Sequence, residues 1–439
     1  MHVVINMVNT IKRIFMNKLL LLSVLALGVF SLNTVSIQAD DNDGELQGHV
    51  IGTSQYFDSF VQINIYHRMD QDEMDAIEDE VRDMLRHFHQ IATKHDSFSG
   101  VTNVKTINEN PGEWHEVDAD LFDMIELSIE YYDITNGYFD ITLGPVIELW
   151  DDYREDCHDF YNSIAGDENR QQRLEEELDD YCRVPSMEDL EAANEHVGLD
   201  RIELDHDNKA IRIEEGMVLD LGGIGKGYAA KAVGDYLKTI DGIDAFLLNA
   251  GTSNVEVHGD HPFRENKLWY TGLTDPTNPT QRYGSLKISG GDNVTTSGDY
   301  QRYYEVDGRK YHHLIDPNTL FPTDHHRSVS LVSSDGSIGD ILVTAIFIMP
   351  LEEGLDFVNS HDGLEAIWYI DSNTVEMSDN LEEQYLRQLD LDGLSGNDEA
   401  SNTALVLALL IPGFGLIVFS GVTLLVKKGL ITIPFLKQK

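Results

Sequence analysis

Cysteine and basic residues are scarce in this chain of 439 residues. Its two cysteines, Cys157 and Cys182, form no CxxC or Cys/His pattern that would hold a structural metal. The 31 lysines and arginines stand against 77 aspartates and glutamates, for a formal net charge of -46 at pH 7. Such an acidic surface repels phosphate backbones, so nucleic acid is a poor candidate partner. A small anionic ligand would bind only where local cations or a metal ion reverse the field.

The N-terminus has the plan of a secretory signal peptide. Basic residues within 12–18 precede an apolar run at 19–30, and a small residue, Ala39, precedes the acidic Asp40. We therefore expect residues 1–39 to be a signal peptide. An uncleaved membrane anchor is the alternative interpretation.

The C-terminus has the pattern of a membrane span. Residues 403–426 carry no charge and are long enough to cross a bilayer as a helix. Lys427 and Lys428 follow directly, which predicts a cytoplasmic tail over 427–439. The polar residues 386–402 predict a short tether. Together the two ends predict a protein of the cell membrane with a single C-terminal span and its globular body on the extracytoplasmic side.

Residues 48–385 form the predicted body. Strand patterns occur in runs with long helical patterns between them, which predicts an α+β fold with mainly antiparallel sheets and flanking helices. Residues 151–195 are acidic, have helical character and hold both cysteines, so we interpret them as an insertion. In an exported protein a disulfide that closes this segment is plausible, and two unpaired cysteines remain the alternative.

The first candidate site is DLGGIGKGYA, residues 220–229. Glycines between a predicted strand and a predicted helix let the backbone approach a ligand, and the helix N-terminus with Lys226 favours an anion. The segment is not a Walker A loop, because Gly227 stands where serine or threonine is needed, and its glycine spacing is not the dinucleotide fingerprint. A tight turn between strand and helix explains the same residues.

The second candidate is the pair Asp340 and Thr344. At a spacing of four residues on a helix both oxygens lie on one face, where they would suit Mg²⁺. The alternative is that Asp340 only caps this helix.

Two further stretches add aromatic and imidazole groups. In NGYFDITLGP (136–145) Tyr138 and Phe139 would flank a planar ring, although a turn with two core aromatics explains them equally. In TTSGDYQRYYEVDGRKYHHLIDP (295–317) His312 and His313 alternate on a strand, so at most one of them faces a given site. The combination of all four features predicts a bound dinucleotide with Mg²⁺, without choosing flavin over adenylate.

Six blocks in order resemble the ApbE-type FAD:protein FMN transferases. They are FDSFVQINIY, TNVKTIN, TNGYFDITLGPVIELW, DLGGIGKGYAA, TTSGDYQRYYEVDGRKYHHLIDP and GDILVTA. The resemblance implies a T-fold-like body that binds FAD between its two halves. It also implies a reaction in which Mg²⁺ polarises the pyrophosphate, a threonine or serine hydroxyl of a partner protein attacks the FMN phosphorus, and AMP leaves.

The resemblance also assigns roles to residues of this sequence. Asp340 and Thr344 would bind Mg²⁺ through their side chains and Gly223 through its carbonyl, while His313 and Lys226 would act at the phosphates with Asp340. The residues that would contact FAD are Phe57, Phe98, Tyr138, Phe139, Asp140, Asp220, Lys226 and, through its backbone, Ile315. Leu320 departs from the family pattern, because it stands where the family has glycine.

Alternative functions use the same residues. One is an FAD pyrophosphatase that gives FMN and AMP, with water in place of the acceptor hydroxyl. Another is a surface flavin-binding module without catalysis. The transferase interpretation requires an acceptor protein with a flavinylation motif, expected to be a membrane or surface redox protein.

Overall fold

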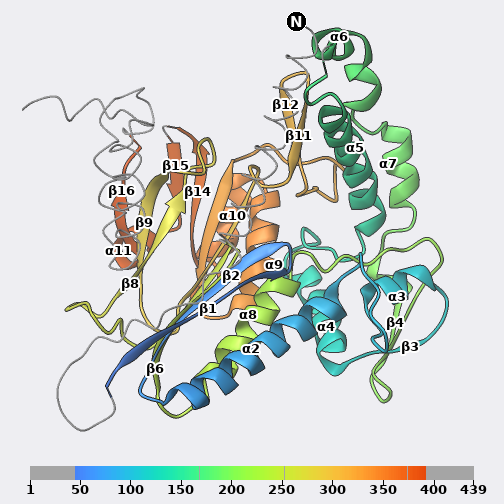
Figure 1. The fold of residues 1–439 in the computed structure, drawn as a ribbon. Coiled ribbons are helices and arrows are strands. Elements are labelled where there is room, and N and C mark those ends of the chain that lie inside the picture. The colour runs from blue at the N-terminus through green and yellow to red at the C-terminus, as the bar shows by residue number, and fades with distance from the viewer. Residues whose placement is uncertain (1–44, 168, 252, 373, 392–439) are drawn as a thin grey trace, which may run out of the picture. The chain divides into compact units, whose positions relative to one another are not determined.

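The fold is known from a computed structural model that describes residues 45–391 except 168, 252 and 373 (Figure 1). The predicted signal peptide (1–39), membrane span (403–426) and tail (427–439) lie outside the described residues. In the part of the chain that the structure describes, no helix is both long and apolar enough to cross a membrane.

An eight-stranded sheet is the centre of the described unit (Figure 1). Every neighbouring pair in it is antiparallel. In spatial order its strands are β1 (Gln47–Tyr56), β2 (Ser59–His67), β6 (Ile243–Ala250), β7 (Asn254–His258), β10 (Asn293–Gly298), β13 (Ser328–Ser333), β14 (Glu365–Asp371) and β15 (Thr374–Met377). The predicted antiparallel α+β fold is thereby confirmed.

Three smaller antiparallel sheets accompany it. One contains β16 (Leu386–Leu389), β9 (Arg282–Ile288) and β8 (Trp269–Thr274), and another contains β3 (His115–Glu116), β5 (Ala210–Ile213) and β4 (Ile202–Asp205). The third is a hairpin of β11 (Tyr303–Val306) and β12 (Arg309–His312). Because β16 pairs with β9, the predicted boundary between body and tether at 385/386 is wrong, and the folded chain continues to Leu389.

The helices occur between these strands. They are α2 (Gln71–Ala92), α3 (Val104–Glu109), α4 (Ala119–Ile134), α5 (Gly144–Ser163), α6 (Arg170–Tyr181), α7 (Met187–Asn194), the short 3₁₀ turn η1 (Leu199–Arg201), α8 (Gly225–Lys238), α9 (Gly336–Ile348), α10 (Leu351–Asn359) and α11 (Leu381–Gln384). The first of them follows its sequence pattern closely. A capping box of Asp70 and Glu73 starts α2, and its buried residues recur at intervals of three and four.

The main core lies where α8 and α9 pack on the sheet and on each other. Helix α9 is buried on almost every side, which agrees with its continuous apolar sequence. A second cluster joins α2 and α8 to the inner residues of β1, β2 and β6. The sheet thus holds α8 and α9 in fixed positions, and both helices contribute to the site described below.

A tight turn joins β1 and β2 into an antiparallel hairpin. Phe57 and Asp58 occupy the turn, and both have left-handed backbones with φ of 58° and 50°. Two such residues in succession match the twist of an antiparallel hairpin. The sequence has no glycine or asparagine at these two positions, so it lacks the usual signal of a hairpin turn.

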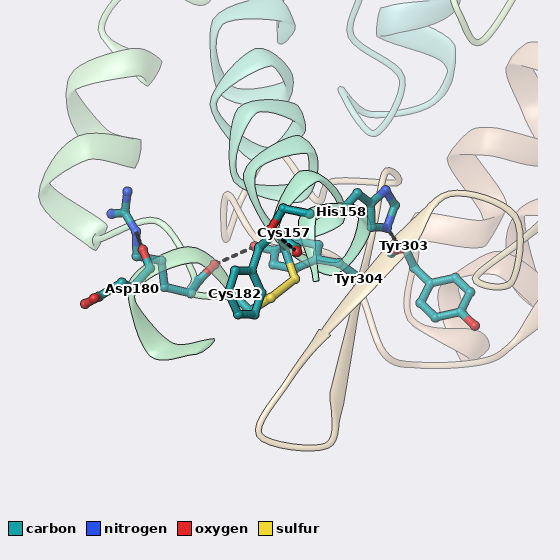
Figure 2. The surroundings of a disulfide bond; sticks show 9 residues. Cys157, His158, Asp180, Cys182, Tyr303 and Tyr304 are labelled. Carbon is teal, nitrogen blue, oxygen red and sulfur yellow. Dashed lines mark hydrogen bonds between the residues drawn. A yellow bond between two sulfur atoms is a disulfide. The ribbon is translucent and has the colours of Figure 1, made fainter. Parts of the chain in front are cut away.

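The cysteine-bearing segment is helical, as predicted, and consists of most of α5 together with α6 and α7. Cys157 on α5 and Cys182 at the end of α6 form a disulfide (Figure 2). This finding decides between the paired and unpaired alternatives. Both sulfur-bearing residues are buried, in a hydrophobic cluster that also includes Trp150.

Candidate active site

A cavity of about 430 Å³ opens beside α8 and α9. Its size suits a cofactor-sized ligand. The predicted site residues that line it are Phe57, Tyr138, Phe139, Asp140, Asp220, Gly223, Lys226, His313, Ile315, Asp340 and Thr344. They come from segments that are far apart in the sequence, and the fold therefore brings residues from five of the six blocks together at one cavity, TNVKTIN being the exception.

Asp340 lies in the second turn of α9, and it does not cap the helix. The N-cap is Asp335, whose carboxylate accepts hydrogen bonds from the backbone N–H groups of Ser337 and Ile338. The capping alternative for Asp340 is therefore wrong. Its Oδ2 instead accepts a hydrogen bond of 2.6 Å from the backbone N–H of Gly227 on α8. Burial raises the pKa of Asp340 to about 6, against the opposing effect of the nearby lysine.

The other two proposed metal ligands lie close to Asp340. The hydroxyl of Thr344 donates to the carbonyl oxygen of Asp340 at 2.9 Å, one turn earlier on the same helix. A side chain at position 223 would place its Cβ 3.6 Å from Thr344 Oγ1 and 2.8 Å from the ring of Phe139. Glycine is required there because any larger residue would strike the aromatic ring. The backbone at Gly223 therefore lies near Thr344, and carboxylate, hydroxyl and carbonyl oxygens are the donor types that Mg²⁺ prefers.

The glycine turn before α8 differs from its prediction in two ways. Residues 217–221 belong to neither a helix nor a strand, so no strand directly precedes the turn. The amides at the helix N-terminus are also largely occupied, because Gly225 donates to Leu221 and Gly227 donates to Asp340. The glycines therefore serve close packing more than anion binding. A Cβ at Gly227 would lie 2.3 Å from the carbonyl oxygen of Gly336.

Lys226 carries the positive charge of this turn into the cavity. Its Nζ donates to Ser253 Oγ at 2.8 Å, and burial lowers the pKa of the ammonium group. A buried ammonium with a single hydroxyl partner in the described structure is a good binding group for a phosphate oxygen, which would replace lost hydration.

Asp220 is already paired within the protein. Its Oδ2 lies 2.9 Å from Nζ of Lys94, and its Oδ1 accepts a hydrogen bond of 2.7 Å from the backbone N–H of Gly222. Burial alone would raise the pKa of Asp220, but the Lys94 ammonium and these hydrogen bonds hold it below its ordinary value. Lys94 also lines the cavity and lies 3.8 Å from Glu148. The sequence prediction missed Lys94, since a single lysine after a helix carries no pattern.

The aromatic residues fall into two groups. Phe57, Tyr138 and Phe139 line the cavity as expected. Phe98 does not line it and packs instead against the ring of His89, with ring centroids 6.1 Å apart. The structure thus places His89, and not Phe98, at the cavity wall, and the contact of Phe98 with FAD stays a prediction. Asp140 lines the wall while its Oδ1 accepts two hydrogen bonds from Thr142.

The two adjacent histidines have different surroundings, His312 at the end of β12 and His313 just beyond it. His312 is buried, and its Nε2 pairs with the carbonyl of Thr323 at 2.7 Å. His313 lines the cavity, and its Nδ1 is buried without a hydrogen-bond partner in the described structure. Burial, with His312 and Arg302 nearby, lowers the pKa of His313 to about 3. The imidazole is therefore neutral at physiological pH, which suits hydrogen bonding and not the attraction of a phosphate by charge.

Comparison with known proteins supports this assembly. Residues 57–368 match the model of the ApbE family. The chain belongs to the ApbE family. It is 29% identical over 265 residues to the FAD:protein FMN transferase of Klebsiella pneumoniae (strain 342), covering 60% of this chain and 72% of that relative. The corresponding protein of Treponema pallidum is 28% identical over 272 residues, 60% of this chain and 68% of its own length.

A solved structure extends the likeness to three dimensions. The crystal structure of the ApbE protein from Thermotoga maritima aligns with a TM-score of 0.62 at 27% identity, covering 76% of this chain and 98% of that one. The relatives of this ApbE protein are named as transferases, which confirms the predicted enzyme class.

Proposed function

We propose that this ApbE protein transfers the FMN part of FAD to a threonine or serine hydroxyl of a partner protein, with Mg²⁺ as cofactor and AMP as the second product. The observation that carries the proposal is the cavity itself. Buried hard-oxygen donors, a buried lysine and aromatic rings face one space there.

The charges that line the cavity support a divalent cation. Five aspartates and three lysine or arginine side chains line it. The aspartates are Asp58, Asp140, Asp151, Asp220 and Asp340, and the basic residues are Lys94, Lys226 and Arg302. Lys94 is already paired with Asp220. The doubly charged pyrophosphate of FAD would meet a net negative wall, and a cation bound by the protein removes that repulsion.

The residues present fit Mg²⁺. Asp340 has a second carboxylate oxygen besides the one that accepts from Gly227, and burial raises its pKa although Lys226 and hydrogen bonds from Gly227 and Asn254 oppose the shift. We assign the side chains of Asp340 and Thr344 and the carbonyl of Gly223 as the ligands. When bound, the ion would neutralise charge on the transferred phosphoryl group.

The reaction forms one bond and breaks one. The acceptor hydroxyl oxygen bonds to the FMN phosphorus, the bond from that phosphorus to the bridging oxygen breaks, and AMP leaves with that oxygen while the hydroxyl proton is released. In this proposal Lys226 holds a phosphate oxygen and Phe57, Tyr138 and Phe139 flank the ligand. The unpartnered Nδ1 of His313 offers a hydrogen bond to the ligand.

Mass spectrometry of an acceptor tests the proposal. The enzyme is incubated with FAD, Mg²⁺ and a protein that carries a D-x-x-[ST] flavinylation motif, and the acceptor should gain the mass of FMN while AMP appears in equal amount. Rapid AMP release without any acceptor would instead favour the pyrophosphatase. Bound FAD that is never cleaved would favour the flavin-binding module.

We also propose that the body lies on the extracytoplasmic side of the cell membrane. The signal-like N-terminus, the apolar run at 403–426 and the Cys157–Cys182 disulfide support this location, since disulfides persist in oxidising compartments. Protease added to intact cells should digest the body, and protection of the body would contradict the location.

A further inference from the structure

Each cysteine of the disulfide is followed by a residue that is hydrogen-bonded to strand β11 of the hairpin β11–β12. His158, the residue after Cys157, donates from Nε2 to the carbonyl of Tyr303 at 3.2 Å. Arg183, the residue after Cys182, accepts at its carbonyl a hydrogen bond of 3.0 Å from the hydroxyl of Tyr304. Figure 2 shows the disulfide next to Tyr304, with His158 close to Tyr303.

The disulfide strengthens the attachment of Arg183. Helix α6, which leads to Cys182, has no fully buried residue, although its Leu174 and Leu178 pack against the cysteine cluster. The disulfide connects its end to α5, which is anchored by buried Trp150 and Phe160. Arg183 also contacts α5 directly, through a hydrogen bond of 3.0 Å to the hydroxyl of Tyr153, and the disulfide adds a covalent link to this contact.

The hairpin in turn forms one wall of the cavity. Gln301 and Arg302 precede β11, His313 and Ile315 follow β12, and all four line the cavity. The backbone N–H of His313 donates to the carbonyl of Arg302 at 3.2 Å, which closes the base of the hairpin. Ile315 also belongs to the hydrophobic cluster that contains both cysteines.

Trp150 adds a third contact to this arrangement. Its indole stacks on Tyr311 of β12 with ring centroids 5.5 Å apart, and its N–H donates to the carbonyl of Leu320 at 2.9 Å. Leu320 has a left-handed backbone, with φ of 62°, in the turn after the hairpin. Helix α5 thus contacts both strands of the hairpin and the turn that follows it.

We propose that the Cys157–Cys182 disulfide is a positioning element of the active site, which holds the β11–β12 hairpin and through it the cavity wall formed by Arg302, His313 and Ile315. Its effect on catalysis rests on the proposed function. The proposed metal ligands Asp340 and Thr344 lie on α9 and not on the hairpin. Loss of the disulfide should therefore weaken FAD binding without changing Mg²⁺ binding.

The double variant Cys157→Ala/Cys182→Ala tests the proposal. Hydrogen exchange should increase over residues 299–316 and stay unchanged in α8 and α9. The KM for FAD should rise about tenfold, because displaced contacts weaken binding, while the Mg²⁺ concentration for half-maximal activity stays the same. A folded double variant with wild-type exchange over 299–316 and wild-type KM for FAD would overturn the proposal.

Single variants keep the test valid if the double variant fails to fold. Tyr304→Phe removes only the hydrogen bond to Arg183 and should raise the KM for FAD a few-fold with the disulfide intact. Tyr161→Phe, which changes an exposed tyrosine on α5, is the matched control and should leave it unchanged. Wild-type KM in Tyr304→Phe would count against the proposal. If the wild-type protein itself binds no FAD, the proposed function fails, and the exchange measurement still decides the role of the disulfide.

Discussion

The carboxylate of Asp340 accepts a hydrogen bond from the backbone N–H of Gly227, and this bond joins α9 to α8 beside the cavity. The contact is close because position 227 has no side chain. A Cβ there would lie 2.3 Å from the carbonyl oxygen of Gly336 and 2.8 Å from Cγ of Asp340. The proposed metal ligand and the lysine next to Gly227 are therefore placed by a single helix contact.

Gly227→Ala should separate the two helices. Because the new methyl group meets a backbone oxygen, we expect a loss of about 1–3 kcal/mol in the free energy of unfolding. Urea denaturation measures this loss. Gly225→Ala is the stability control, since its Cβ would meet only the Cβ of Ala92 at 3.4 Å. Equal stability of the two variants would show that the two helices move apart at little cost in the free energy of unfolding.

Asp340→Asn should abolish the metal dependence of the reaction. The substitution keeps the size of the side chain and removes its negative charge, so we expect FMN transfer to fall roughly 100-fold or more. Asp335→Asn on the same helix is the control, because asparagine is also a good N-cap and the position lies outside the cavity lining. Transfer at the wild-type rate by Asp340→Asn would eliminate the metal assignment.

Lys94→Met should destabilise the protein through Asp220. The side chains of Lys94 and Asp220 are only 9% and 17% exposed, so loss of the lysine leaves a buried carboxylate without its cation. We expect a cost of about 3 kcal/mol in the free energy of unfolding. Lys267→Met breaks a pair whose side chains are 66% and 65% exposed and should cost less than about 1 kcal/mol. Similar costs would mean that the Lys94 pair is screened by water.

Acid should destabilise the protein through buried His326. The side chain is 3% exposed and lies against the ring of Phe347, and burial lowers its pKa to about 3. The unfolded chain, with an ordinary histidine pKa near 6.5, binds the proton more readily, so stability falls as the pH drops from about 6.5 toward 3.

His326→Phe should remove this part of the acid sensitivity. Between pH 7 and pH 4 we expect the free energy of unfolding of the variant to fall by roughly 3 kcal/mol less than that of the wild-type protein. Denaturation curves at the two pH values measure the difference. A drop of the same size in both proteins would assign the acid sensitivity to other groups.

Local patterns predicted the elements well where one face of a helix or strand is buried. The intervals of three and four in α2 and the continuous apolar sequence of α9 each appear as helices with the expected buried residues. Such patterns are set by neighbours within one or two turns, so the sequence contains them directly.

Several differences from the sequence interpretation depend on distant partners. Capping by Asp340 was the alternative interpretation, but its partner Gly227 is 113 residues away. The amide of Gly227 in the glycine turn is occupied by that same contact. The strand at 386–389 forms only because β9 offers an edge for pairing.

The sequence by itself determined the ApbE family, the antiparallel α+β class and the spacing that puts Asp340 and Thr344 on one face of a helix. Only the tertiary structure decided that Cys157 pairs with Cys182 and that Lys94 neutralises Asp220. It also places His313, the histidine that the resemblance selected, at the cavity, one residue beyond β12, where its position depends on what packs against it. That packing is set by segments far away along the chain.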